Sequence, residues 1–133
     1  GYTMHIFRTE GYEVKGIDVI KGMIKKAKEK GFDVILGDMK NLEQNFKKKK
    51  FDAIVSISAL QWIKDKESLK KVAKGIYAVL KDNGKAVIQF YPKSKEELIN
   101  IVKIFGKNNF NAKIVIDNED ISSKRTVFLI LEK

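Results

Sequence analysis

Residues 51–63 read FDAIVSISALQWI, and this stretch decides the fold. Its first eight residues, 51–58, form a nearly continuous apolar run, which is typical of a strand buried on both faces of a parallel sheet. Small residues follow, and then come Gln61 and Trp62, the only tryptophan of the chain. The stretch therefore predicts a buried strand whose end presents an amide and a large aromatic ring.

Strands and helices alternate on both sides of this stretch. The apolar patterns predict strands over residues 12–19, 32–38, 51–58, 85–92, 110–117 and 125–133. Helical spacing predicts helices over 20–31, 69–80 and 94–105, with KDNG (81–84) closing the second and Ser94 capping the third, and NLEQNF (41–46) is expected to be a short helical or irregular segment. The seven residues between the last two strands are too few for a crossover helix, so these strands are expected to pair antiparallel. The predicted fold is α/β, a Rossmann-like, doubly wound and mostly parallel sheet with an antiparallel C-terminal hairpin.

Composition limits the classes of protein to consider. The chain has 133 residues, 44% of them hydrophobic and 33% charged, which predicts one globular domain. No apolar run reaches the roughly 20 residues that span a bilayer, and residues 1–18 lack the apolar segment of a signal peptide. Cysteine is absent, which excludes disulfides, thiolate metal ligands and cysteine nucleophiles. Its absence fits an intracellular protein, cytoplasmic or, in a eukaryote, nuclear.

The net charge of +10 permits a nucleic-acid partner but does not identify one. Only Arg8 and Arg125 among the 27 basic residues are arginine, and most lysines are mixed with glutamate on predicted helix faces. A solvated helix surface explains that pattern. The denser lysine run 47–50 precedes a strand, where a solvated loop explains it equally well.

Two aspartates end predicted strands, at the edge where doubly wound sheets bind ligands. Asp18 ends the first strand 17 positions after Gly1. An acidic side chain about 20 residues beyond a glycine-rich turn is placed to accept both hydroxyls of a ribose. It is also placed to cap the following helix. Asp38 ends the next strand, where it either accepts a hydrogen bond from an adenine amino group or serves as a turn residue after glycine. Together the two aspartates favour an adenosine-containing cofactor.

The segment SALQW (58–62) follows the buried strand predicted over residues 51–58. It is therefore expected to lie across from the reactive end of such a cofactor. Trp62 is either a core residue that covers the sheet edge or a flat wall for a planar substrate. Gln61 offers a donor and an acceptor, which suits a base edge or a polar small molecule. His5 is the only histidine, and we interpret it as an ordinary helix residue. A single histidine and no cysteine make histidine-based hydrolysis and a metal site unexpected.

The order of these motifs resembles that of class I S-adenosylmethionine-dependent methyltransferases. Three stretches more narrowly resemble the small-subunit ribosomal RNA guanine-N7 methyltransferases. They are SISALQW (56–62), AVIQFYPKSKEEL (86–98) and FNAKIVIDNEDISSKRTVFLIL (110–131). The resemblance covers essentially the whole chain, so it implies that residues 1–133 are one methyltransferase domain.

The chain departs from this family in two places. The family carries a D-x-G-x-G-x-G motif after its first strand, and here only Gly1 remains, matching the last glycine. The strand before the motif, which lies at the centre of the family's sheet, is missing as well. We therefore interpret the domain as N-terminally incomplete and expect a hydrophobic strand with a glycine-rich turn upstream of Gly1. Eukaryotic members also continue in a basic C-terminal tail, whereas this chain stops at Lys133.

The resemblance implies methyl transfer from S-adenosyl-L-methionine to guanine N7 in small-subunit ribosomal RNA, and hence a part in rRNA processing and ribosome biogenesis. Gln61, Trp62 and Tyr91 are expected to hold the purine at the reaction centre. The cofactor is expected to contact Gly1, Asp18, Val19, Asp38, Met39 and Ser58.

The resemblance also implies a protein partner, a small zinc-binding activator that docks by extending the sheet at the edge strand 32–38. The alternative is that the neighbouring NLEQNF segment (41–46) folds over this edge and hides it. Three other functions remain open. They are a small-molecule methyltransferase, an inactive module that keeps only the cofactor fold, and a dinucleotide dehydrogenase, which the antiparallel C-terminal hairpin makes the weakest.

Overall fold

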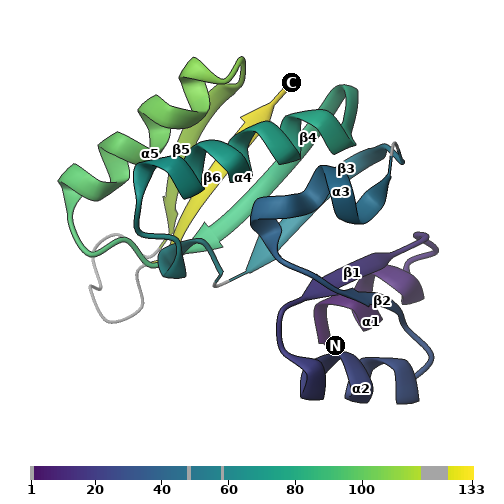
Figure 1. Cartoon of the computed structure of the whole chain (residues 1–133). Coiled ribbons are helices and arrows are strands. Elements are labelled where there is room, and N and C mark those ends of the chain that lie inside the picture. Colours follow the sequence, from purple (N-terminus) through teal and green to yellow (C-terminus); the bar gives the residue numbers. More distant parts are fainter. Residues whose placement is uncertain (1, 48, 58, 118–125) are drawn as a thin grey trace.

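The structure is a computed structural model that describes residues 2–47, 49–57, 59–117 and 126–133 (Figure 1). The N-terminal half contains α1 (Tyr2–Thr9), β1 (Lys15–Asp18), α2 (Lys21–Glu29), β2 (Asp33–Leu36), the 3₁₀ turn η1 (Met39–Asn41) and α3 (Leu42–Phe46). The rest contains β3 (Phe51–Ile57), the 3₁₀ turn η2 (Leu60–Trp62), α4 (Lys66–Val79), β4 (Leu80–Phe90), α5 (Lys95–Lys107), β5 (Asn111–Asp117) and β6 (Thr126–Glu132).

The strands form two sheets. β1 and β2 pair in parallel, with Asp18 opposite Leu36. The second sheet has the order β3-β4-β6-β5, in which β3 and β4 are parallel and β6 is antiparallel to both of its neighbours. The predicted α/β class and the antiparallel C-terminal hairpin are thus confirmed. The expected single sheet is divided between β1 and β3, at the place where the resemblance puts the family's central strand.

β4 is longer than the sequence predicts. KDNG (81–84) was expected to close a helix before a strand over 85–92, but α4 ends at Val79 and β4 begins at Leu80. Asn83 has a φ of +64°, in the left-handed region that asparagine tolerates better than most residues. The pairing of β4 with β3 shifts in register between Phe51 and Ala53. KDNG, which has the composition of a turn, therefore forms an irregular beginning to the strand.

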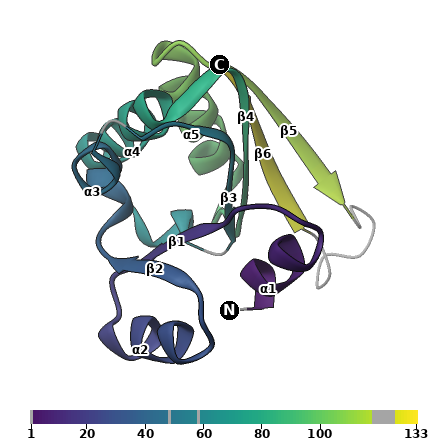
Figure 2. The same ribbon diagram turned by 90° about the vertical axis from the view of Figure 1, so that its right-hand side faces the viewer.

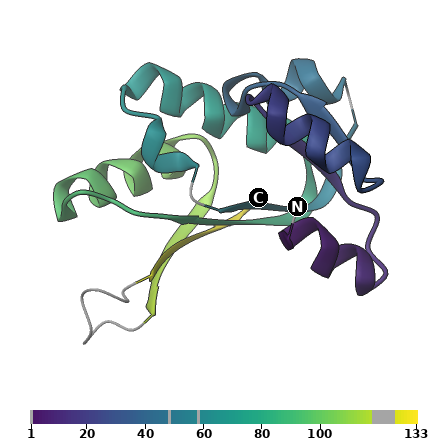
Figure 3. The ribbon, with the colours of Figure 1, turned by 90° about the horizontal axis from the view of Figure 1, so that it is seen from below.

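The main core lies between the four-stranded sheet and one layer of helices. α4 and α5, teal and green, cover one face of this sheet (Figures 2 and 3). Alternate side chains of β4 and β6 point toward these helices and are buried. The fully buried members include Leu60, Val72, Ile76, Leu80, Ile88, Phe90, Ile101, Phe105, Leu129 and Leu131.

The prediction that the strand over 51–58 is buried on both faces is wrong. Phe51 and Ile54 of β3 pack against the main core, whereas Ala53, Val55 and Ile57 are exposed. α4 and α5 lie on one face of the sheet only, so the alternate side chains of β3 remain in contact with solvent. An apolar run alone therefore does not show whether helices cover one face of a strand or both faces.

A second, smaller core supports β1 and β2. Ile24 of α2 packs with Phe32 and Val34, and Met4 of α1 lies against them. A Cβ at Gly16 would lie 2.8 Å from the sulfur of Met4 and 2.9 Å from a methyl of Val34, so a larger residue there would force these side chains to shift.

Packing joins the two parts of the molecule. Ile17 of β1 and Met39 of η1 lie against the main core. Leu42 of α3 lies over Gly75 of α4, where its Cβ would be 3.3 Å from a Cβ added to that glycine. α3 therefore docks on α4, which fixes the ends of β1 and β2 relative to the four-stranded sheet.

Lys133 caps the end of α4 from the far end of the sequence. Its Nζ donates hydrogen bonds to the carbonyl oxygens of Tyr77 at 2.9 Å and Leu80 at 2.6 Å. The ammonium also lies 3.7 Å from a carboxylate oxygen of Asp82 and 4.4 Å from the centre of the Tyr77 ring. Its side chain is only 8% exposed, because these partners satisfy a charge that is otherwise costly to bury.

Candidate active site

Asp18 lies at the carboxyl end of β1, and among the described residues only one of its carboxylate oxygens has a hydrogen-bond partner. The Oδ1 atom accepts a hydrogen bond from the Ile20 N–H at 2.9 Å. This is a turn at the strand end and not the predicted helix cap, because Ile20 holds the N-cap position of α2. The Oδ2 atom makes no hydrogen bond within the part of the chain that the structure describes. Asp18 can therefore accept hydroxyl groups from a ligand without giving up its turn.

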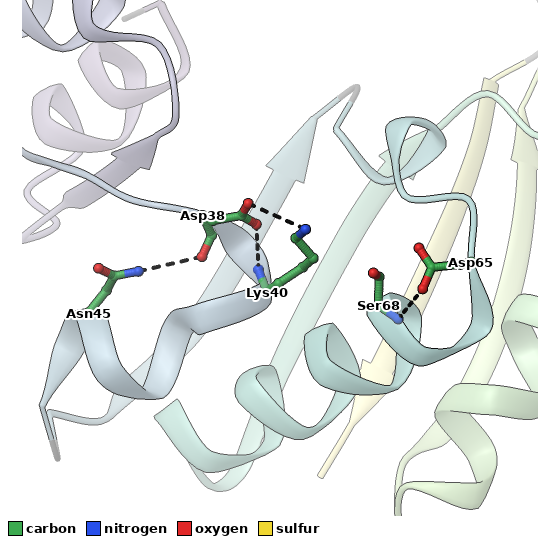
Figure 4. A network of polar contacts seen from close by, with 5 residues as sticks. All are labelled: Asp38, Lys40, Asn45, Asp65 and Ser68. Atoms are coloured by element: carbon green, nitrogen blue, oxygen red, sulfur yellow. Dashed lines mark hydrogen bonds and ion pairs between the residues drawn. The ribbon is translucent and has the colours of Figure 1, made fainter.

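Asp38 lies beside this turn but is already engaged. The Gly37 N–H donates to the carbonyl oxygen of Asp18 at 2.9 Å, which holds the two strand ends together. Asp38 Oδ1 accepts from the Lys40 N–H at 2.9 Å, and Oδ2 lies 3.8 Å from the Lys40 Nζ (Figure 4). Asn45 donates to the Asp38 carbonyl at 3.4 Å. Asp38 thus serves as a turn residue. Its carboxylate is less available to an adenine amino group than the Asp18 carboxylate is to ribose hydroxyls.

The turn η1, which contains Lys40, packs against α4. Asp65 is the N-cap of that helix, and its Oδ2 accepts from the Ser68 N–H at 2.9 Å (Figure 4). The hydrogen bonds from the backbone and hydroxyl of Ser68, with a smaller contribution from the positive charge of Lys40, hold the pKa of Asp65 below its usual value. The beginning of α4 is therefore part of the same polar region as Asp38.

Two aromatic rings are exposed at the carboxyl ends of β3 and β4. Trp62 is 73% exposed, so the interpretation of Trp62 as a core residue is wrong. Tyr91 is 51% exposed, and its hydroxyl lies 3.5 Å from the amide nitrogen of Gln89. Because Ile57 pairs with Gln89, the segments that carry the two rings leave the sheet at the same edge. Exposed aromatic faces there are suited to binding a flat ligand.

The other residues predicted to contact the cofactor or the substrate differ in how accessible they are. Val19 follows Asp18 and is 60% exposed, which makes it available to a ligand. Met39 packs partly against the main core. Gly1 and Ser58 lie outside the described residues. The backbone of Gln61 lies in η2, while its side chain falls outside the described part.

Sequence reasoning did not single out Lys64 and Lys93, which also lie at this edge. Lys64 immediately precedes the cap of α4, and Lys93 immediately precedes Ser94, the cap of α5. The segments that carry them leave the sheet at the same edge because β3 pairs in parallel with β4. Residue spacing alone does not predict which strands are neighbours. The sequence therefore offered no reason to group these two lysines with the aromatic rings.

The described residues offer no site for a metal ion. Within 2–47, 49–57, 59–117 and 126–133, no group of three or more histidine, aspartate or glutamate side chains is arranged to hold one. His5 is exposed in α1, where its carbonyl accepts a hydrogen bond from the Thr9 hydroxyl at 2.8 Å, as an ordinary helix residue would. None of the helices in these ranges has the length and apolar character needed to cross a bilayer.

Comparison with known families decides the class of protein. Residues 1–88 match the family described as "Methyltransferase domain", which is more than half of the chain. The chain belongs to this methyltransferase family. The matched residues include Asp18, Asp38 and Trp62, and they extend into β4.

Curated relatives match this chain over most of its length. The 18S rRNA (guanine-N(7))-methyltransferase of Bos taurus is 33% identical over 132 residues, which cover 92% of this chain and 47% of that protein. The 18S rRNA (guanine(1575)-N(7))-methyltransferase of Saccharomyces cerevisiae is 31% identical over 131 residues, covering 90% and 47%. The chain thus spans about half the length of the curated relatives it matches.

A solved structure agrees with the fold. A SAM-dependent methyltransferase from Archaeoglobus fulgidus superposes with a TM-score of 0.75 at 20% identity, covering 98% of this chain and 80% of that chain. At this identity the similarity concerns the fold alone.

Proposed function

We propose that this domain, residues 1–133, methylates N7 of a guanine in small-subunit ribosomal RNA, using S-adenosyl-L-methionine. The observation that carries the proposal is the pair of exposed rings, Trp62 and Tyr91, which leave the sheet at the carboxyl ends of neighbouring strands. The names of the curated relatives support the same substrate class. The protein would act where this RNA is processed, in the cytoplasm or the nucleus.

The residues at the ends of β1 and β2 fit the adenosine part of the cofactor. Asp18 Oδ2 is available to the ribose hydroxyls, and the exposed Val19 beside it offers an apolar surface to the adenine. Asp38, already bonded to Lys40, would contribute a weaker contact. When bound, the cofactor supplies an electrophilic methyl group on a positively charged sulfur.

Guanine N7 requires positioning and not proton removal. N7 has an in-plane lone pair and carries no proton, so it can attack the methyl carbon directly. The N7–carbon bond would form as the carbon–sulfur bond breaks. The positive charge passes to the purine, and no general base takes part. Trp62 and Tyr91 would fix the plane of the ring with Gln61 at its edge, and positioning of this kind can lower a barrier by about 7–11 kcal/mol.

Salt dependence tests the substrate class. If RNA is the substrate, its binding should weaken steeply with added salt, because lysines that neutralise phosphates release counterions. The slope of log affinity against log salt is expected to be about −0.7 for each phosphate contacted on a single strand. The measurement is the Michaelis constant for an 18S rRNA fragment at several salt concentrations. A salt-independent Michaelis constant on a small metabolite would instead support a small-molecule methyltransferase.

We also propose that a small zinc-binding activator protein docks on β2. Within the described residues β2 pairs only with β1, and Leu36 at its end is 46% exposed. The NLEQNF segment packs on α4 through Leu42 and borders the end of β2 through Asn45, which lies against Gly37, but among the described residues it forms no strand pairing with β2. An edge strand with unpaired backbone groups and apolar side chains favours pairing with another chain.

A lysine in place of Leu36 is expected to abolish this complex. Leu36 is the better position because Val34 is buried in the small core, where a lysine would disrupt the fold itself. The measurement is co-expression with the activator followed by size-exclusion chromatography. Val115→Lys, an equally exposed change on the edge strand β5, is the matched control and should leave the complex intact. A monodisperse and fully active protein without any partner would contradict the proposal.

A further inference from the structure

Two lysines lie beside the exposed aromatic rings. Lys64 follows Trp62 by two residues, and Lys93 follows Tyr91 by two residues. β3 and β4 are paired neighbours, η2 lies against β4, and the two helices that begin just after these lysines pack on each other. Each of two adjacent chain segments therefore carries a ring and then a lysine at the same edge of the sheet.

The two ammonium groups act on each other. The nearby ammonium of Lys93 holds the pKa of Lys64 below its usual value of 10.5, an effect that the negative charge of Glu97 opposes in part. Asp65, the carboxylate next to Lys64 in sequence, is occupied by the Ser68 N–H. Neither lysine forms an ion pair with another of the described residues. Other lysines on the surface do pair, as with Lys15–Asp33 at 2.9 Å and Lys70–Glu67 at 3.3 Å.

Two positive charges on neighbouring segments at one edge of the sheet favour an anion that both can contact. A phosphodiester presents two charged oxygens, one for each ammonium, and each contact would be a charge-assisted hydrogen bond. Its binding would also relieve the repulsion between the lysines. Proteins that bind single-stranded RNA combine aromatic platforms for the bases with basic residues along the backbone. The same two elements lie next to each other here.

We propose that Lys64 and Lys93 together bind one phosphate of the RNA strand, next to the guanine held by Trp62 and Tyr91. The inference rests on the proposed function and deepens it, since it assigns the residues that hold the substrate backbone. The two lysines are positioning residues, because they touch the strand beside the reacting base and not the base itself.

The experiment compares RNA binding by two double variants of the whole chain. Lys64→Gln with Lys93→Gln removes the proposed contact, whereas Lys103→Gln with Lys107→Gln removes the same charge from the later turns of α5. The probe is a single-stranded 18S rRNA fragment, with affinity measured by fluorescence anisotropy over a range of salt concentrations. The first variant should bind about tenfold more weakly, since each exposed ion pair contributes up to about fivefold. Its salt slope should fall by about 0.7, the value for one phosphate of a single strand.

A second readout separates a phosphate contact from a general loss of charge. In an NMR titration, the pKa of Lys64 should rise toward 10.5 in the Lys93→Gln variant, and also in the wild type when the oligonucleotide is added. Equal RNA affinity and equal salt slopes in the two double variants, in a protein that still methylates RNA, would overturn the phosphate contact and leave the proposed function standing. A wild type that binds no RNA would overturn both.

Discussion

Asp18→Ala should weaken the binding of S-adenosyl-L-methionine by about 100-fold or more. The carboxylate is assigned to two ribose hydroxyls, and hydrogen bonds to a charged group contribute roughly 1.5–3 kcal/mol each. Asp38→Ala should have a smaller effect, because the Asp38 carboxylate is already bonded to the Lys40 N–H and lies near its ammonium. Isothermal titration calorimetry on the three proteins measures the difference.

Two controls separate the ligand contact from damage to the turn. Asp18→Asn keeps an acceptor for the Ile20 N–H while removing the charge, so it should fold normally and bind with intermediate affinity. Asp33→Ala removes a carboxylate from the opposite end of the same small sheet, where Asp33 pairs with Lys15, and should leave cofactor affinity unchanged. Equal affinity of the wild type and Asp18→Ala would contradict the assignment of Asp18.

Trp62→Ala should lower kcat/KM for RNA by roughly 10- to 100-fold while cofactor affinity stays nearly constant. Stacking of a base on an aromatic side chain contributes about 1–3 kcal/mol, and the ring belongs to the substrate side of the site. Because Trp62 is 73% exposed, its truncation leaves no cavity and should not unfold the protein. Single-turnover methylation and thermal denaturation are the two measurements.

Trp62→Phe and Tyr12→Ala complete this test. The phenylalanine keeps an aromatic face and should recover most of the activity. Tyr12 is a similarly exposed ring that precedes β1, so its removal should have no effect on methylation. If Trp62→Ala instead unfolds the protein and has no separate effect on activity, the ring has a structural role.

Most of the fold could be predicted because strand and helix periodicity are local properties. The predicted helices and strands recur within a few residues of their observed bounds, and the seven-residue spacing of the last two strands was enough to indicate the hairpin β5–β6. β3 and KDNG (81–84) are two places where prediction from local periodicity fails. Whether Val55 is covered depends on helices far away in the sequence, and the left-handed Asn83 is compatible with either a turn or an irregular strand.

The candidate site could be predicted only as a set of strand ends. The positions of Asp18 and Asp38 follow from where their strands stop, but Asp38 is engaged by Lys40, a contact that depends on the turn η1. The exposure of Trp62 and the proximity of Lys64 to Lys93 depend on how neighbouring segments leave the sheet. Side-chain surroundings of this kind are set by tertiary packing, which one-dimensional spacing does not contain.

The small core under β1 and β2 has a thermodynamic consequence. Ile24, Phe32 and Val34 are the buried residues of that cluster, whereas β4 and β6 rest on the much larger core. Local opening costs less free energy where less apolar contact is lost, so amide protons of β1 and β2 should exchange with solvent before those of β4. A ligand that binds only the closed form stabilises it by about 2.7 kcal/mol at a hundredfold excess over its dissociation constant. The half of the molecule that carries Asp18 would therefore gain the most rigidity from the cofactor it binds.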